Sequence, residues 1–336
     1  MPAPLVIGHR GASGYRPEHS ESAYRLAFEL GADLVEPDIV STRDGVLVVR
    51  HENEISGTTD VAAHPEFADR RTTKVVDGKS LTGWFTEDFD WAELRTLRCR
   101  ERLAKLRPAN TEFDGDEPIL RLADVLRIID DESAAHGREF GVVLEIKHAQ
   151  FFLDRGYDLG EMLLTDLERA GWDARPDRVV FESFELGVLD RLREAGAQGE
   201  LVFLTERGGA PADEPVGDAH PRGYVWYRSD AGLDLLATRV DGISVAKSNL
   251  IKLGPVGIAV GPTTLVKRAH ARGLRVYTWT LRPENFFLSL RFQRPISPAH
   301  HGDWQGEFGL IIGSGVDGIF VDHPDLGRAA VEKREG

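Results

Sequence analysis

A strand-like run followed by a helix-like stretch recurs along most of this chain, and that alternation constrains the fold more than any other feature of the sequence. Short runs of apolar and β-branched residues, typical of buried strands, alternate with amphipathic stretches of helical spacing. Runs apolar enough to be buried on both faces are typical of a parallel sheet covered by helices. The eight runs lie at Leu5–Gly8, Leu34–Val40, Gly141–Lys147, Arg178–Phe184, Glu200–Thr205, Val240–Val245, Leu274–Trp279 and Val316–Val321.

Eight β/α units favour the α/β class and a closed (β/α)8 barrel, the TIM barrel. The alternative is an open doubly wound sheet, which is disfavoured because no Gly-x-Gly-x-x-Gly turn follows the first run. Helices are expected between the strands, and several of them end just before a glycine, as helices commonly do. They are predicted at Glu21–Leu30, Leu120–Asp130, Leu159–Ala170, Glu185–Ala195, Leu233–Thr238 and Thr263–Ala271.

Two stretches do not follow the repeat. Residues 52–118 are polar and irregular, and they predict a small subdomain inserted after the second strand, over the barrel mouth. Residues 282–313 follow the seventh strand. Insertions that follow barrel strands lie on the carboxyl face of the barrel, where active sites of such barrels are found. We therefore expect a single barrel domain over residues 1–336 that carries this insertion.

The charge balance limits the classes of partner. The chain has 41 lysine and arginine residues against 55 aspartate and glutamate residues, a net charge of −14. Such a surface repels nucleic acid and anionic membranes, so neither is an expected partner, and an anionic substrate requires locally placed positive charge. Cys99 is the only cysteine, which excludes an intrachain disulfide. No apolar run is long enough to span a bilayer, and a cytoplasmic location is the default expectation, with secretion open if a leader has been removed.

Carboxylates on two expected strands indicate a cation site. Glu36 and Asp38 are two residues apart in a strand and therefore project from one face. If the two carboxylates are buried, a divalent cation relieves the repulsion between them. The alternative is a strand end exposed to solvent, where no cation is needed. Glu145 on the third strand can complete a set of three oxygen donors for one Mg²⁺ or Ca²⁺ ion. Lys147 shares the face of Glu145, and the alternative for that pair is a buried structural salt bridge.

Two histidines follow apolar runs. His9-Arg10-Gly11 ends the first run and places a titratable imidazole beside a bidentate oxyanion donor. The alternative here is a capped turn with a surface arginine. His51 provides a second imidazole, so that the two histidines can act as acid and base in turn. Three acids with two bases around one point predict a site for a bound anion.

Other polar and aromatic residues at strand ends are weaker candidates. Trp279, on the seventh strand, can form an aromatic wall for a small polyol or headgroup, although such a tryptophan is as often part of the core. Asp322 and His323 close the eighth strand. The sequence assigns no role to them, nor to His19 or Lys247.

In their order along the chain, these motifs resemble those of the glycerophosphodiester phosphodiesterase family. The resemblance spans nearly the whole chain, and Trp279 and the Gly318–Pro324 segment are similar to the family as well. This chain has His19-Ser20 where the family usually has Asn-Thr, and Glu52 after His51 where the family usually has Asp. The motifs that carry the resemblance are His9-Arg10-Gly11, Pro17-Glu18, Glu36-Pro37-Asp38, His51 and Glu145-Ile146-Lys147.

The resemblance implies a (β/α)8 barrel with one divalent cation, Ca²⁺ or Mg²⁺, bound by Glu36, Asp38 and Glu145. It also implies that His9 and His51 are the general acid and base. The substrate- and phosphate-binding residues are then expected to be Arg10, Lys147, Glu18 and Trp279.

The expected reaction is hydrolysis of a glycerophosphodiester to glycerol 3-phosphate and an alcohol, through a cyclic phosphate. One alternative is a phospholipase-D-type enzyme acting on lysophospholipid or sphingolipid, which the acidic balance disfavours. Another is a non-catalytic barrel that binds phosphate or polyol, which the two histidines disfavour because binding alone needs no proton transfer. The alcohol headgroup, the choice of ion and the oligomeric state stay open.

Overall fold

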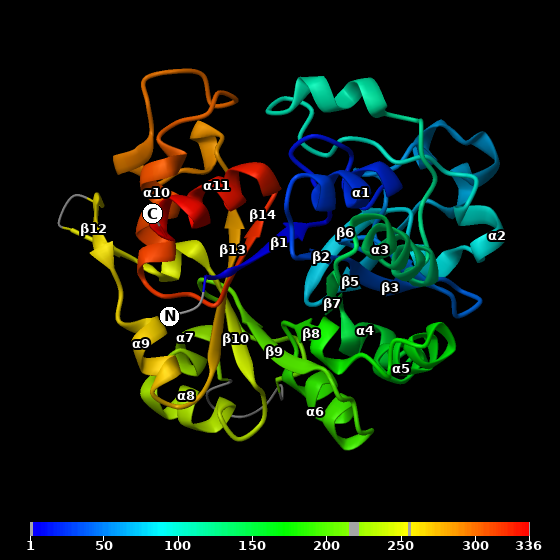
Figure 1. The fold of residues 1–336 in the computed structure, drawn as a ribbon. Helices are drawn as coiled ribbons and strands as arrows, with labels where there is room; N and C mark the ends of the chain where they lie inside the picture. The colour runs from blue at the N-terminus through cyan, green and yellow to red at the C-terminus, as the bar shows by residue number, and fades with distance from the viewer. Residues whose placement is uncertain (1–2, 215–221, 255–256, 336) are drawn as a thin grey trace.

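Parallel strands close into a barrel at the centre of the molecule (Figure 1). The computed structural model describes residues 3–214, 222–254 and 257–335. The pairing of β1 with β14 and of β2 with β7 completes the ring, so the predicted (β/α)8 barrel is confirmed. Around the ring the eight strands are β1 (Leu5–His9), β2 (Leu34–Glu36), β7 (Gly141–Ile146), β8 (Val179–Ser183), β9 (Glu200–Thr205), β10 (Gly242–Ala246), β13 (Arg275–Leu281) and β14 (Gly318–Val321).

The second expected strand is divided in the structure. Pro37, which has no N–H group to donate to a neighbouring strand, separates β2 from β3 (Asp38–Ser41). The register against β7 nevertheless continues across the proline, with Val35 opposite Val142 and Asp38 opposite Glu145. Beyond it, β3 pairs with the antiparallel β4 (Leu47–Val49), which leads the chain to His51.

Helices occupy the predicted intervals, and two of them extend beyond a predicted end. The helix expected to end at Asp130 continues to His136 and ends at Gly137, which takes a left-handed φ of 58°. The helix expected from Leu233 begins at Asp230, because the Ser229 side chain caps it by accepting from the Gly232 N–H. The α-helices outside residues 52–118 are α1 (Glu21–Glu29), α3 (Leu122–His136), α4 (Ala149–Leu153), α5 (Leu159–Ala170), α6 (Leu186–Glu194), α7 (Tyr224–Tyr227), α8 (Asp230–Leu236), α9 (Leu265–His270), α10 (Trp304–Gly313) and α11 (Pro324–Glu335).

The two stretches outside the repeat fold into short elements. Residues 282–313 contain η7 (Asn285–Phe287), η8 (Leu290–Phe292) and α10, and a small hairpin of β11 (Ile251–Leu253) and β12 (Ala259–Pro262) follows β10. The division of the chain into a barrel domain and an inserted subdomain stays a prediction. Residues 52–118 contain η1 (Val61–Ala63), η2 (Pro65–Arg70), the hairpin of β5 (Thr72–Val76) and β6 (Lys79–Gly83), η3 (Thr86–Asp88), α2 (Trp91–Leu94) and η4 (Pro108–Phe113).

Alternation along the strands produces two apolar clusters. One side of each strand packs against the surrounding helices in the main core, and the other side points into the barrel. Among the described residues, no helix is both long and apolar enough to cross a membrane. The second cluster, which we call the barrel-interior cluster, consists of Ile7, Leu34, Val143, Val180, Val202, Tyr277 and Phe320.

Candidate active site

Polar side chains follow the barrel-interior cluster toward the carboxyl end of the strands. Side chains two residues apart share a face of a strand, so the residue two positions after each cluster member also points inward. These positions hold polar or aromatic groups in place of aliphatic ones on six strands. The pairs are Ile7 and His9, Leu34 and Glu36, Val143 and Glu145, Val180 and Glu182, Tyr277 and Trp279, and Phe320 and Asp322.

Strand register brings the acids into one layer. His9 lies opposite Glu36, Asp38 lies opposite Glu145, and Glu145 lies opposite Glu182. Glu36, Glu145 and Glu182 each offer a carboxylate oxygen, and these three oxygens lie within 4.8 Å of one another. The structure therefore brings two of the predicted metal ligands together, and the third member of this close group is Glu182 in place of Asp38.

Glu182 was missed by the sequence analysis. It is only 1% exposed and lies inside the apolar run of β8. The available signal was an acidic residue two positions after Val180, on the face that the parallel strands turn toward the barrel axis.

Asp38 lies next to this group but binds basic partners. Its Oδ2 is 2.9 Å from His19 Nε2 and 3.2 Å from Arg10 Nε, and its Oδ1 is 3.6 Å from Lys147 Nζ. Although burial opposes the shift, Lys147 and nearby cationic groups hold the pKa of Asp38 well below its usual value. The Oδ1 atom is nevertheless buried without a hydrogen-bond partner.

The acid layer fits a metal ion. Burial, and then repulsion from Asp38 and Glu145, raises the pKa of Glu36 well above its usual value. Burial also raises the pKa of Glu145 to about 8, although Lys147 opposes it. The Glu182 Oε2 atom, which is buried with no partner, adds to this excess of negative charge. A hard divalent cation takes carboxylate oxygens as ligands, so these residues can hold one.

His9 is oriented by a buried carboxylate. Its Nδ1 lies 2.7 Å from Asp322 Oδ1, and Asp322 Oδ2 accepts hydrogen bonds from Arg107 at 2.5 Å and Arg282 at 2.6 Å. These two arginines hold the pKa of Asp322 well below its usual value against the effect of burial, so the carboxylate is ionised and Nδ1 carries the proton. Burial, followed by the charge of Arg10, lowers the pKa of His9 to about 4. The Nε2 lone pair is thus left to accept a proton.

The backbone and the side chain of Arg10 donate to different carboxylates, those of Glu36 and Glu18. Arg10 adopts a left-handed φ of 60°, and its N–H donates to Glu36 Oε2 at 2.8 Å. Its side chain donates from Nη1 to Glu18 Oε2 at 3.0 Å. The next residue, Gly11, has a φ of 85°, and a Cβ there would lie 2.6 Å from the backbone of Ala23, which only glycine avoids.

His51, like His9, has a carboxylate on its Nδ1, and Arg102 links that carboxylate to Glu18, the partner of Arg10. The His51 Nδ1 is 2.5 Å from Glu52 Oε1, and Arg102 donates both to Glu52, at 2.8 Å, and to Glu18, at 2.6 Å. Burial, then the charges of Arg10 and Lys147, lowers the pKa of His51 well below its usual value. Each predicted histidine therefore has a carboxylate on Nδ1, and each of those carboxylates binds at least one arginine.

A small cavity opens beside His9. Its basic lining comes from distant parts of the chain, and residues 52–118 contribute Arg102 and Arg107 to it. Arg107 also donates to Glu284 at 2.6 Å and to the Ser13 carbonyl at 2.9 Å, which ties the inserted segment to the barrel. The sequence analysis did not single out these arginines. The cavity is lined by His9, Arg10, Ser13, Glu18, Glu101, Arg102, Leu103, Arg107, Arg282 and Asp322.

Lys147 and Trp279 meet at Phe184. Lys147 Nζ is 2.6 Å from Glu145 Oε1 and 5.5 Å from the centre of the Phe184 ring. Trp279 packs edge-on against the same ring, with the ring centres 5.6 Å apart, and its indole Nε1 is buried without a partner. The salt bridge predicted as the alternative for Lys147 is thus present, and it lies within the acid layer.

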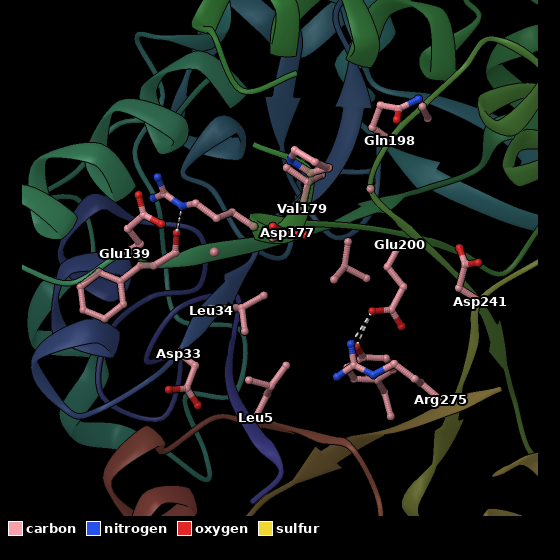
Figure 2. A pocket seen from close by; sticks show the side chains of 18 of the residues that line it. Leu5, Asp33, Leu34, Glu139, Asp177, Val179, Gln198, Glu200, Asp241 and Arg275 are labelled. Atoms are coloured by element: carbon pink, nitrogen blue, oxygen red, sulfur yellow. Dashed lines mark hydrogen bonds and ion pairs between the residues drawn. The ribbon is translucent and has the colours of Figure 1, made fainter. Parts of the chain in front are cut away.

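A wider cavity lies at the amino end of the strands, away from these groups (Figure 2). Its lining includes the first residues of β1, β2, β8 and β9. It also includes three ion pairs, which are Arg138 with Asp33, Arg193 with Asp241 and Arg275 with Glu200. We call it the amino-end cavity, and Figure 2 labels Leu5, Asp33, Leu34, Glu139, Asp177, Val179, Gln198, Glu200, Asp241 and Arg275 around it.

Comparison with known proteins agrees with the motifs. The model of the glycerophosphoryl diester phosphodiesterase family matches residues 9–326. The chain is 32% identical over 338 residues to glycerophosphodiester phosphodiesterase GDPD6 of Arabidopsis thaliana, covering 95% of this chain and 83% of that protein. It is 27% identical over 345 residues to a glycerophosphodiester phosphodiesterase of Haemophilus influenzae, covering 96% and 88%.

Solved structures share the fold. A glycerophosphodiester phosphodiesterase from Agrobacterium tumefaciens superposes with a TM-score of 0.60 at 18% identity, covering 97% of this chain and 99% of the other. A phosphodiesterase from Oleispira antarctica, in complex with the product sn-glycerol-3-phosphate, superposes with a TM-score of 0.64 at 18% identity, covering 98% and 97%.

Proposed function

Because the chain belongs to the glycerophosphoryl diester phosphodiesterase family, we propose that it hydrolyses glycerophosphodiesters to glycerol 3-phosphate and an alcohol at the carboxyl end of its barrel. The observation that carries the proposal is the convergence of an uncompensated acid layer, an arginine-lined cavity and His9 at that end. The arginines supply the local positive charge that an anionic substrate needs on a protein of net charge −14. The product found in the Oleispira antarctica enzyme supports the same substrate class.

His9 and His51 exchange the roles of base and acid. In the first step one imidazole removes the proton of the glycerol hydroxyl next to the phosphate, whose oxygen forms a new bond to phosphorus. The bond from phosphorus to the alcohol breaks, and the other imidazole protonates the departing oxygen. Water then opens the cyclic phosphate with the two roles reversed, giving glycerol 3-phosphate. The Asp322 carboxylate supports this cycle because it fixes the proton of His9 on Nδ1 and leaves Nε2 as the reacting atom.

Arg10 and Lys147 bind the phosphoryl oxygens. Arg10 is held by Glu18, and Lys147 by Glu145, so both cations are placed before substrate arrives. Glu18 also binds Arg102, and through it the inserted segment reaches the site. We place residues 52–118 over the barrel mouth as a subdomain that excludes water from the phosphate. Trp279 forms an aromatic wall of the substrate site.

Glu36, Asp38 and Glu145 hold one divalent cation, Ca²⁺ or Mg²⁺. Their burial and the unpartnered Asp38 oxygen support this assignment. When bound, the ion supplies positive charge to a phosphoryl oxygen and lowers the pKa of the attacking hydroxyl.

A coupled assay for glycerol 3-phosphate tests the proposal. The enzyme is given a panel of glycerophosphodiesters that differ in the alcohol, first as prepared, then with EDTA, then with Ca²⁺ or Mg²⁺ added back. We expect release that EDTA abolishes and one of the two ions restores. Release that persists in EDTA would contradict the cation assignment, and absence of release from every member of the panel with either ion present would contradict the proposed reaction.

A further inference from the structure

The buried acid layer contains two carboxylates, those of Glu36 and Glu182, that form no ion pair with a basic side chain in the part of the chain that the structure describes. Glu145 is paired with Lys147 at 2.6 Å. Asp38 is paired with Arg10 at 3.2 Å and with His19 at 2.9 Å.

Glu36 accepts the backbone N–H of Arg10 at 2.8 Å, which leaves Glu182 as the carboxylate with the fewest partners. In the part of the chain that the structure describes, no basic side chain forms an ion pair with it, and its Oε2 is buried without a hydrogen-bond partner. It is 1% exposed, so water does not solvate the side chain. Burying an unpaired carboxylate is costly, so the side chain is either protonated or compensated by a positive group in the working protein.

The position of Glu182 limits what that group can be. Its register partner across β7 and β8 is Glu145, and its carboxylate lies within 4.8 Å of those of Glu145 and Glu36. A positive group placed among these carboxylates can therefore contact all three oxygens at once. A small divalent cation does this, because its preferred ligands are several oxygens around one centre.

We propose that Glu182 is a further ligand of the divalent cation, together with Glu36 and Glu145. The inference rests on the cation site of the proposed function and extends it to a residue on a third barrel strand, β8. Added to Glu36, Asp38 and Glu145, it is a fourth carboxylate at the site, and the greater negative charge favours a divalent ion over a monovalent one.

A neutral, purely structural Glu182 is the competing explanation. A protonated glutamic acid and a glutamine have nearly the same shape and are both uncharged, so Glu182→Gln would then leave cation binding unchanged. A ligand loses its charged oxygen in the same substitution. The variant thus separates the two explanations without changing the volume of the core.

Calorimetric titration of the metal-free protein with CaCl₂ and with MgCl₂ provides the test. We expect Glu182→Gln to weaken binding of the preferred ion by about tenfold or more, since even outer partners of metal ligands change affinity by about 10- to 100-fold. Glu200→Gln is the matched control, because Glu200 is also a barrel-strand glutamate with an unpartnered buried oxygen, but lies in the amino-end cavity. The affinity of Glu200→Gln for the ion should equal that of the wild type.

Glu182→Asp keeps the negative charge on a shorter side chain, and its affinity for the ion should lie between those of the wild type and Glu182→Gln. Thermal unfolding with and without the ion gives a second readout, in which the ion should raise the midpoint of Glu182→Gln less than that of the wild type. A dissociation constant of Glu182→Gln within about twofold of the wild type, a difference of only about 0.4 kcal/mol, would overturn the inference and leave the proposed function intact. Absence of binding of either ion to the wild type would overturn both.

Discussion

Charged side chains line a cavity at each end of the barrel, but the two ends differ in how completely buried carboxylates are paired. At the amino end, Arg275 binds Glu200 at 2.6 Å and Arg193 binds Asp241 at 3.0 Å, around the wider cavity. At the carboxyl end the cavity is smaller, and among the described residues Glu182 has no ion-pair partner and its Oε2 is buried without a hydrogen bond. Charge that is buried without compensation marks the end that binds something, whereas the size of a cavity does not.

One residue at the amino end makes the difference in pairing between the two ends less complete. Glu200 also has an oxygen, Oε1, that is buried and unpartnered. Its other oxygen, however, accepts from both Arg275 at 2.6 Å and Tyr277 at 2.9 Å, so the carboxylate as a whole is compensated. A buried oxygen without a hydrogen-bond partner therefore belongs to an uncompensated carboxylate at the carboxyl end but to a compensated one at the amino end. Substitutions at both ends can test this difference.

Loss of either histidine is expected to have the largest effect. His9→Ala and His51→Ala should each lower kcat by about 10²- to 10⁴-fold, the usual contribution of a general acid or base. Turnover of a glycerophosphodiester by the metal-loaded variants measures the effect. His136→Ala, at the end of α3, is the control and should keep wild-type turnover. Near-normal kcat in folded His9→Ala and His51→Ala proteins would remove the basis for calling the carboxyl end catalytic.

Loss of the carboxylate behind His9 should have a smaller effect. Asp322→Asn keeps the shape of the side chain but no longer fixes the proton on His9 Nδ1. We expect kcat to fall by about 10- to 100-fold with little change in KM, since an outer partner orients the imidazole without touching substrate. A rise in KM at constant kcat would instead assign Asp322 to substrate binding.

The pH dependence of stability should expose the acid layer in the metal-free protein. The pKa of Glu145 is raised by burial to about 8, whereas a glutamate in the unfolded chain titrates near about 4.3. Between these values the native state holds a proton that the unfolded chain has released, so the free energy of unfolding falls as pH rises. The lowered pKa values of His9 and His51 act in the opposite direction below about pH 6.5, so chemical denaturation in EDTA from about pH 6.5 to about pH 8 should show this fall, and Glu145→Gln should flatten part of it. Equal slopes for the two proteins would contradict the assigned pKa.

Substitution at the amino end should leave catalysis untouched. Glu200→Gln weakens the contacts with Arg275 and Tyr277, and we expect a loss of about 1 kcal/mol in the free energy of unfolding with unchanged kcat and KM. Denaturation and steady-state kinetics on one preparation measure both. Loss of turnover in a stable Glu200→Gln protein would show that the two ends are not functionally distinct.

Periodicity predicted the barrel and the faces of its strands well. Leu34–Val40 was expected as one strand, and although Pro37 divides it, the register on both sides of the proline is the same. Glu36 and Glu145 could be placed together because residues two apart share a face and neighbouring strands align. The same rule applied to the run from Val179 would also have placed Glu182 in this layer.

Side chains that return to the site from a distance could not be predicted. Arg107 reaches Asp322 across 215 positions of sequence, and Arg102 reaches Glu18 across 84, from a segment without strong periodicity. Nor does a pattern of residues show that Asp38 binds His19 and Arg10, because that depends on the left-handed turns at Arg10 and His19. Long polar side chains on irregular backbone take their partners from the tertiary structure, which local sequence does not encode.

A crystal structure of the protein grown with glycerol 3-phosphate and Ca²⁺ tests the distinction between the two ends most directly. The account predicts an ion bound by Glu36 and Glu145, and a phosphate that contacts Arg10 with His9 within hydrogen-bonding reach. Glycerol 3-phosphate bound in the amino-end cavity, with no ion bound by Glu36 and Glu145 at the carboxyl end, would contradict this prediction.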